Sequence, residues 1–239
     1  MDRRMFFGTA LLGGGSSVVR GRAAWAQIGG DAHDHGRNSA VLSALIAQLE
    51  SNVRGLREKV VDNLGDLSVG ERLRSIAAGL RLIAVYEVES GTDAKLRAAI
   101  QNKVDRDGEE SVLSAELDIG QFNTEAKALG FNQPPVPGHV DSSIRRAVLR
   151  AVLRDGMAAQ FVLAATAFEE HARTLDTRAG RITRVALQAS NCDELNRQLS
   201  YLAAEVVFAC MFAFICEPCC IAASATWFAW QLMVWAAGC

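Results

Sequence analysis

The stretch LSALIAQLESNVRGLREKVVDNL, residues 42–64, indicates how this chain folds. Its apolar side chains recur at steps of four, three and four residues, as in Leu49, Val53, Leu56 and Val60. This spacing places them on one face of an α-helix, and such a face packs along a partner helix. Gly65 follows the stretch and is expected to end the helix.

Helical spacing of apolar residues recurs in further segments up to about Leu175, with breaks at residues 90–92, 107–108 and 134–138. Ser68 and Glu71 fit a capping box, in which each side chain binds a free amide at the start of a helix. One long helix is expected from Asp141 to about Leu175. Its second half is expected to be central and buried, because residues 156–168 have no charged side chain. No stretch of strand length alternates apolar and polar residues convincingly. The sequence therefore predicts an all-α fold, a helical bundle of about six to eight helices.

The N-terminus shows three features in the order that export signals have them. A pair of arginines precedes two phenylalanines, a weakly apolar stretch follows, and a small-x-small motif completes the pattern: Arg3, Arg4, Phe6, Phe7, Ala24 and Ala26. This pattern resembles the twin-arginine signal peptides of bacteria and archaea. The resemblance implies that the twin-arginine translocase exports a folded chain, cleaved after Ala26, to the periplasm, the cell surface or the medium.

Charge is balanced overall but unevenly distributed. The chain has 25 Lys and Arg against 27 Asp and Glu, a formal net charge of -2. Surfaces that bind nucleic acid are usually basic, so nucleic acid is not an expected partner. From Val206 to Cys239 the only charged residue is Glu217. The C-terminus is therefore the apolar part of the chain.

Two apolar stretches, residues 199–216 and 219–237, flank Glu217 and Pro218. The residue before a proline is disfavoured in a helix, so a break is expected there and the sequence predicts an apolar helical hairpin. Each stretch is long enough to approach the hydrocarbon thickness of a membrane. Four aromatic residues of the second helix share one broad face, which is expected to meet membrane lipid, the rest of the bundle or a helical protein partner: Trp227, Phe228, Trp230 and Trp235.

Three interpretations of this hairpin stay open. It forms the buried centre of the bundle, it inserts into a membrane, or it is released from a precursor as a membrane-active, bacteriocin-like peptide. No Lys or Arg flanks the tip or the chain end, which argues against a positively anchored membrane span. The layout of export signal, helical carrier and cysteine-rich C-terminus resembles that of some exported peptide-toxin precursors, including certain halocins.

All the cysteines lie in the last part of the chain, and in an exported protein an even number predicts disulfides. The sequence does not choose among the pairings. One specific hypothesis joins Cys192 to Cys239, because antiparallel helices bring both to the same end. The disulfide candidates are Cys192, Cys210, Cys216, Cys219, Cys220 and Cys239.

A thiolate-bound metal is the alternative use of these cysteines. Cys216-x-x-Cys219 with Cys220 offers the soft ligands that zinc or copper(I) takes. No other cofactor is predicted. A thioredoxin-like redox role is less favoured, because no alternating strand and helix pattern surrounds the motif. No catalytic motif of a known enzyme class occurs, so the sequence gives no reason to name an enzyme.

The sequence as a whole predicts an exported all-helical protein that associates with a membrane or a partner through its C-terminal hairpin. The predicted organisation is an export signal at 1–26, a flexible N-terminus at 27–37, a helical subdomain at 38–133, a Pro-rich connector at 134–138, a long central helix and turn at 139–190, and the cysteine-rich hairpin at 191–239.

Overall fold

The computed structural model describes residues 35–62, 68–117, 119–131, 140–177 and 192–239. The predicted export signal at 1–26 and the predicted connector at 134–138 lie outside these ranges. The chain divides into two compact units, residues 1–44 and 45–239. The second unit contains residues on both sides of the predicted connector.

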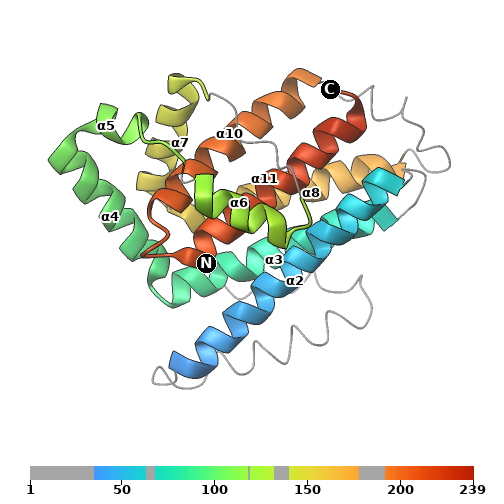
Figure 1. The fold of residues 1–239 in the computed structure, drawn as a ribbon, viewed down its shortest axis with the longest axis horizontal. Helices are drawn as coiled ribbons and strands as arrows, with labels where there is room; N and C mark the ends of the chain where they lie inside the picture. Colours follow the sequence, from blue (N-terminus) through green and yellow to red (C-terminus); the bar gives the residue numbers. More distant parts are fainter. Residues whose placement is uncertain (1–34, 63–67, 118, 132–139, 178–191) are drawn as a thin grey trace, which may run out of the picture. The chain divides into compact units, whose positions relative to one another are not determined.

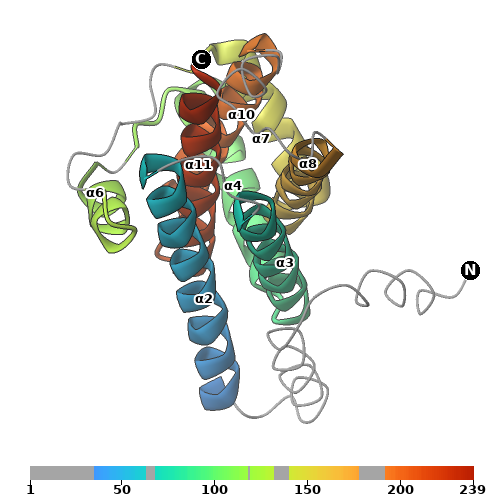
Figure 2. The same cartoon turned by 90° about the vertical axis from the view of Figure 1, so that its right-hand side faces the viewer.

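The described residues are helical and contain no strand, which confirms the all-α class (Figures 1 and 2). The helices in this part of the chain are α2 (His35–Asp62), α3 (Ser68–Glu89), α4 (Thr92–Asp107), α5 (Glu109–Leu113), α6 (Ile119–Ala128), α7 (Ser142–Asp155), α8 (Met157–Thr177), α10 (Cys192–Met211) and α11 (Glu217–Ala237).

The predicted single helix from Asp141 to Leu175 is wrong. The chain turns at Gly156, with a bend of 114° between α7 and α8. Gly156 has a φ of +91°, which favours glycine, and an added Cβ would lie 2.1 Å from a carboxylate oxygen of Asp93 in α4. Asp93 accepts a hydrogen bond from the backbone N–H of Ala158 at 2.9 Å, and so caps the start of α8. The split also makes the number of described helices nine, above the expected six to eight.

The helical periodicity locates the core correctly. The predicted face of α2 is buried, with Leu49, Val53 and Leu56 fully enclosed. On α3 the buried residues follow the same steps and include Leu73, Ile76, Leu80 and Ile83. α3 packs along α8, and a salt bridge of 2.8 Å between Arg81 and Glu169 closes the edge of this pair.

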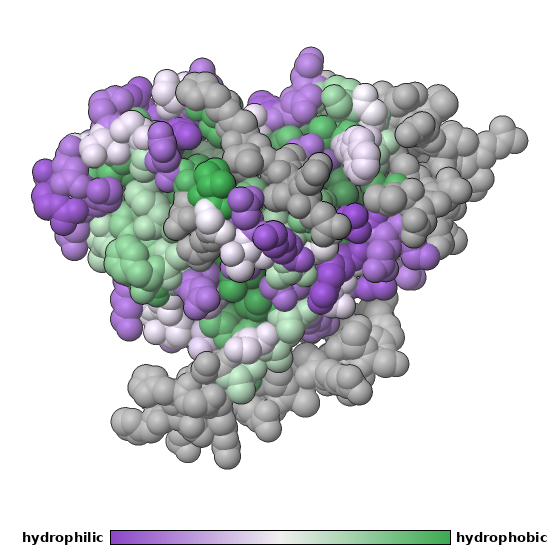
Figure 3. Space-filling model, viewed as in Figure 1, coloured by the Kyte–Doolittle hydropathy of each residue, from purple (hydrophilic) through white to green (hydrophobic). Residues whose placement is uncertain are grey.

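Polar side chains gather over the edge formed by α4 and α5 (Figure 3). Lys103 and Arg106 both pair with Asp107 at 2.8 Å there. Arg146 of α7 forms a salt bridge of 2.9 Å with Glu109 of α5. This edge is a solvated face held by ion pairs, and each exposed pair contributes little to stability.

α11 is the most enclosed helix of the described part. Sixteen of its 21 residues are buried, and it lies beside α10 while also packing against α3, α6 and α8 (Figures 1 and 2). A helix that is apolar all round requires cover on every side, which explains this central place. Within the described residues α11 is the one helix whose length and hydropathy would allow a membrane crossing, and 83% of its apolar window is buried. The bent pair α7 and α8 passes the same test only when joined.

Candidate functional site

All six cysteines form disulfides, and all three bonds lie within residues Cys192–Cys239, here called the C-terminal segment. Cys192 pairs with Cys239, as the sequence hypothesis proposed, and joins the start of α10 to the chain end. Cys210 of α10 pairs with Cys220 of α11. Cys216 pairs with Cys219 at the start of α11. No disulfide ties the C-terminal segment to residues 45–177, here called the body.

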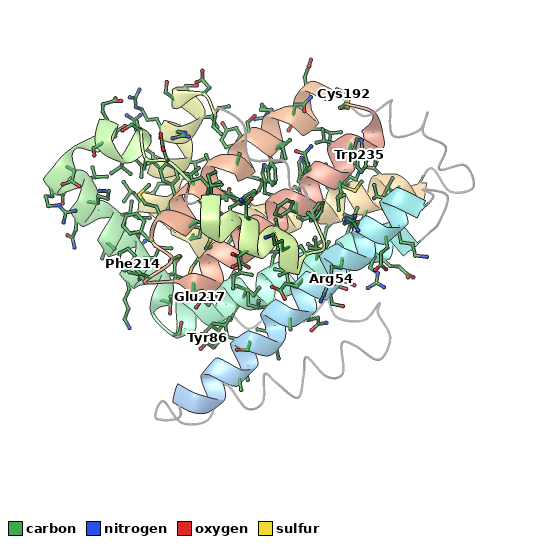
Figure 4. All side chains as sticks on the ribbon, viewed as in Figure 1. Arg54, Tyr86, Cys192, Phe214, Glu217 and Trp235 are labelled. Atoms are coloured by element: carbon green, nitrogen blue, oxygen red, sulfur yellow. A yellow bond between two sulfur atoms is a disulfide. The ribbon has the colours of Figure 1, made fainter. Side chains whose placement is uncertain are left out.

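The four aromatic residues predicted to share one face of the second apolar helix differ in burial. Trp227, Phe228 and Trp230 are buried, as the interpretation of the hairpin as the centre of the bundle expects, while Trp235 is 65% exposed (Figure 4). The physical reason is that the body supplies the aromatic partners. Phe122 of α6 and Phe131 contact the first two, with ring centroids 4.5 to 5.6 Å apart.

Trp230 makes two contacts, one through its rings and one through its indole N–H. Its ring meets the edge of Phe168 of α8 at a centroid distance of 5.2 Å. Its indole N–H donates a 3.0 Å hydrogen bond to the backbone carbonyl of Leu195 in α10. Trp230 therefore connects α11 to α10 through the hydrogen bond and to the body through the edge-to-face contact of its rings with Phe168.

Cys216 is the N-cap residue of α11. Its Sγ accepts a hydrogen bond from the backbone N–H of Cys219 at 3.2 Å. Pro218 stands in the first turn, where its missing N–H leaves no partner unsatisfied. A negative charge on Cys216 would be stabilised at this position by the amide and by the positive end of the helix dipole.

Glu87 of α3 points its carboxyl group at this disulfide. The side chain is 1% exposed, and Oε1 lies 3.2 Å from Sγ of Cys219 and 3.7 Å from Sγ of Cys216. Oε2 is buried and has no hydrogen-bond partner among the described residues. Burial, followed by the negative charge of Asp93, raises the pKa of Glu87 to about 8. Because a disulfide sulfur carries no hydrogen, the protonated carboxyl is the donor in these contacts.

The predicted metal set of Cys216, Cys219 and Cys220 is changed by the structure. The residues that lie close enough together to hold a metal ion include Glu87 and not Cys220, which is bonded to Cys210. One ligand atom from each of Glu87, Cys216 and Cys219 lies within 4.8 Å of the others, a group able to hold a metal ion. The disulfide removes both thiolates from that group, so a metal ligand set exists only after reduction.

Sequence reasoning missed Glu87, although a signal was present. The apolar residues of α3 recur at steps of three and four, and the next step after Ile83 falls on Glu87. A carboxylate on the buried face of a helix is unusual and marks a site that needs an explanation. Glu205 of α10 is a second buried carboxyl, and burial also raises its pKa to about 8, but it is not part of the sulfur cluster.

No protein-family model matches this chain, and no curated protein or solved structure shows significant similarity to it.

Proposed function

We propose that this protein is an exported precursor in which the helical body carries the C-terminal segment, and that the segment acts on a membrane after it leaves the body. The observation that carries this proposal is the pattern of disulfides. All three close within Cys192–Cys239, and none crosses to the body. The segment can therefore separate from the body without breaking a covalent cross-link other than the backbone.

Burial of the aromatic residues favours a C-terminal segment that acts after release over one that acts while attached to the body. Trp227, Phe228 and Trp230 are covered by Phe122, Phe131 and Phe168 of the body, so they touch no lipid while the segment stays attached. Once the body is gone, α11 presents a wide apolar surface that water solvates poorly. We expect membrane lipid to cover this apolar surface of α11 in place of the body.

The composition of the segment suits a membrane interface. α11 is long and apolar enough to cross the hydrocarbon layer, and Trp side chains favour the boundary between lipid and water. Within α11, Glu217 is the only charged residue. Export through the twin-arginine translocase would bring the chain to a compartment where disulfides persist. The location that fits this function is the cell surface or the medium.

The test is the intact mass of every species of this chain in the membrane, periplasmic and medium fractions, measured without reductant. The expected result is a fragment that ends at Cys239, begins between residues 178 and 192, and has a mass that corresponds to three disulfides. The fragment is then added to phospholipid vesicles filled with a dye, where it releases the dye and the full chain does not. A single species that starts near residue 27 in every fraction contradicts the proposal.

A second candidate function is association of the uncleaved protein with a membrane or a helical partner. It is favoured by two exposed aromatic residues, Phe214 at 83% and Trp235 at 65%, which lie towards opposite ends of α11 (Figure 4). The test is co-sedimentation of the full chain with vesicles. Phe214→Ser with Trp235→Ser should abolish binding, whereas Leu163→Ser, an exposed apolar residue on α8, is the matched control and should leave it unchanged.

A further inference from the structure

The cluster of Glu87, Cys216 and Cys219 combines features that a structural cross-link does not require. Of the three disulfides, Cys216–Cys219 closes the shortest loop, so it restricts the unfolded chain least and stabilises the fold least. Beside it stands a carboxyl group that is 1% exposed, with one oxygen unpartnered among the described residues. Burying that group opposes folding, and the disulfide sulfurs are only weak hydrogen-bond acceptors in return.

The two sulfur atoms have different surroundings. Sγ of Cys216 accepts a hydrogen bond from the backbone N–H of Cys219. This sulfur lies at the start of α11, and the N-terminus of a helix stabilises a thiolate. Sγ of Cys219 is the nearer one to the carboxyl group, at 3.2 Å from Oε1 of Glu87. One sulfur is therefore placed to carry a negative charge and the other to exchange a proton. This division of roles is what stepwise thiol–disulfide exchange needs.

We propose that Cys216–Cys219 is a thiol–disulfide exchange site that oxidises cysteine pairs in peptides or proteins, with Glu87 as the acid that protonates the leaving sulfur of Cys219. The assignment does not depend on release of the C-terminal segment, since it uses the attached form, in which α3 supplies Glu87.

The reaction begins when a thiolate of the substrate attacks Sγ of Cys216. The bond between Cys216 and Cys219 breaks, and Sγ of Cys219 leaves with the electron pair and takes the proton of Glu87. A mixed disulfide now joins the substrate to Cys216. The second substrate thiolate attacks the substrate sulfur of that bond and releases Cys216 as a thiolate. The substrate has lost two electrons and gained a disulfide, and its two thiol protons restore Glu87 and protonate Cys216.

Access is governed by the turn that precedes α11. Both sulfurs are buried, and the backbone N–H groups of Ile215 and Cys216 are held by the carbonyl of Phe212 at 2.8 and 3.1 Å. Phe214, the most exposed side chain of this turn, has no cover from the body. Opening these two hydrogen bonds exposes Cys216 first, which agrees with its role as the attacked atom.

The experiment mixes the oxidised full chain with a synthetic peptide that contains two reduced cysteines. After an acid quench, mass spectrometry follows the peptide disulfide and the free thiols of the protein. The expected result is one peptide disulfide per protein, with the new thiols at Cys216 and Cys219. Glu87→Gln should slow the transfer by at least about tenfold, because the leaving sulfur then has no acid. Glu205→Gln removes a buried carboxyl outside the cluster and should leave the rate unchanged.

Two further variants keep the result interpretable. Glu87→Asp retains an acid and should restore part of the rate, and Cys192→Ser with Cys239→Ser should retain the transfer. Thermal unfolding of each variant shows whether the fold persists. The proposal is overturned if the peptide stays reduced with the folded wild-type chain, if the thiols appear at another cysteine pair, or if folded Glu87→Gln transfers electrons as fast as the wild type.

Discussion

Gly156 is the residue on which the path of the chain between α7 and α8 depends. Its φ of +91° and the 2.1 Å approach of an added Cβ to Asp93 act together against any side chain. Gly156→Ala should therefore lower the free energy of unfolding by about 2 kcal/mol or more in a urea titration.

Gly91 provides the control for that measurement. It also has a positive φ, +73°, but nothing lies within 4 Å of an added Cβ. Gly91→Ala should have only the backbone effect, roughly 1 kcal/mol. Equal losses for the two variants would mean that contact with Asp93 contributes nothing at Gly156.

The buried carboxyl group of Glu205 makes the free energy of unfolding depend on pH. Burial raises its pKa from 4.5 to about 8, so between these values the folded chain holds a proton that the unfolded chain releases. Stability is therefore greatest below the lower value and falls as the pH rises through the upper one. The urea midpoint should be lower at about pH 9 than at about pH 5, and Glu205→Gln should remove part of this difference, at most about 5 kcal/mol. A variant with the same difference as the wild type would contradict the prediction.

At the level of the helices, the two ends of the C-terminal segment are held by Cys192–Cys239. Loop-closure entropy gives this bond about 4 kcal/mol, against about 2 kcal/mol for the short Cys216–Cys219 loop. Replacing Cys192 and Cys239 with serine should therefore lower the free energy of unfolding more than replacing Cys216 and Cys219. Urea unfolding of both double variants without reductant compares them, and the reverse order would exclude this account.

Local patterns were enough to predict most helices but not their partners. The periodicity of α2 and the start of α3 at Ser68 are set by neighbours in the sequence, so both were predictable. The turn at Gly156 was hidden because the uncharged residues after it read as a continuous buried helix. Its cause is Asp93, a residue from another helix. Glu87 was missed for the same reason, since its meaning depends on cysteines that only the fold brings to it.

For the molecule as a whole, the contact between the body and the C-terminal segment centres on Phe122, which is fully buried against Trp227 and Phe228. Phe122→Ala should leave a cavity and reduce stability by roughly 3 to 5 kcal/mol. The tryptophan fluorescence of the Phe122→Ala variant should shift to longer wavelength, because water then reaches Trp227. Phe214→Ala, at an exposed phenylalanine, should change stability by less than about 0.5 kcal/mol and serves as the control.

The bond between Cys192 and Cys239 also makes the C-terminal segment a closed ring. A protease that cuts once inside this ring opens it but detaches nothing, because both new chain ends stay joined through the sulfurs. Such a nick leaves one band on a gel run without reductant and separate bands after reduction. A peptide with this topology withstands a first cut, a useful property for a molecule exposed to the proteases of its surroundings.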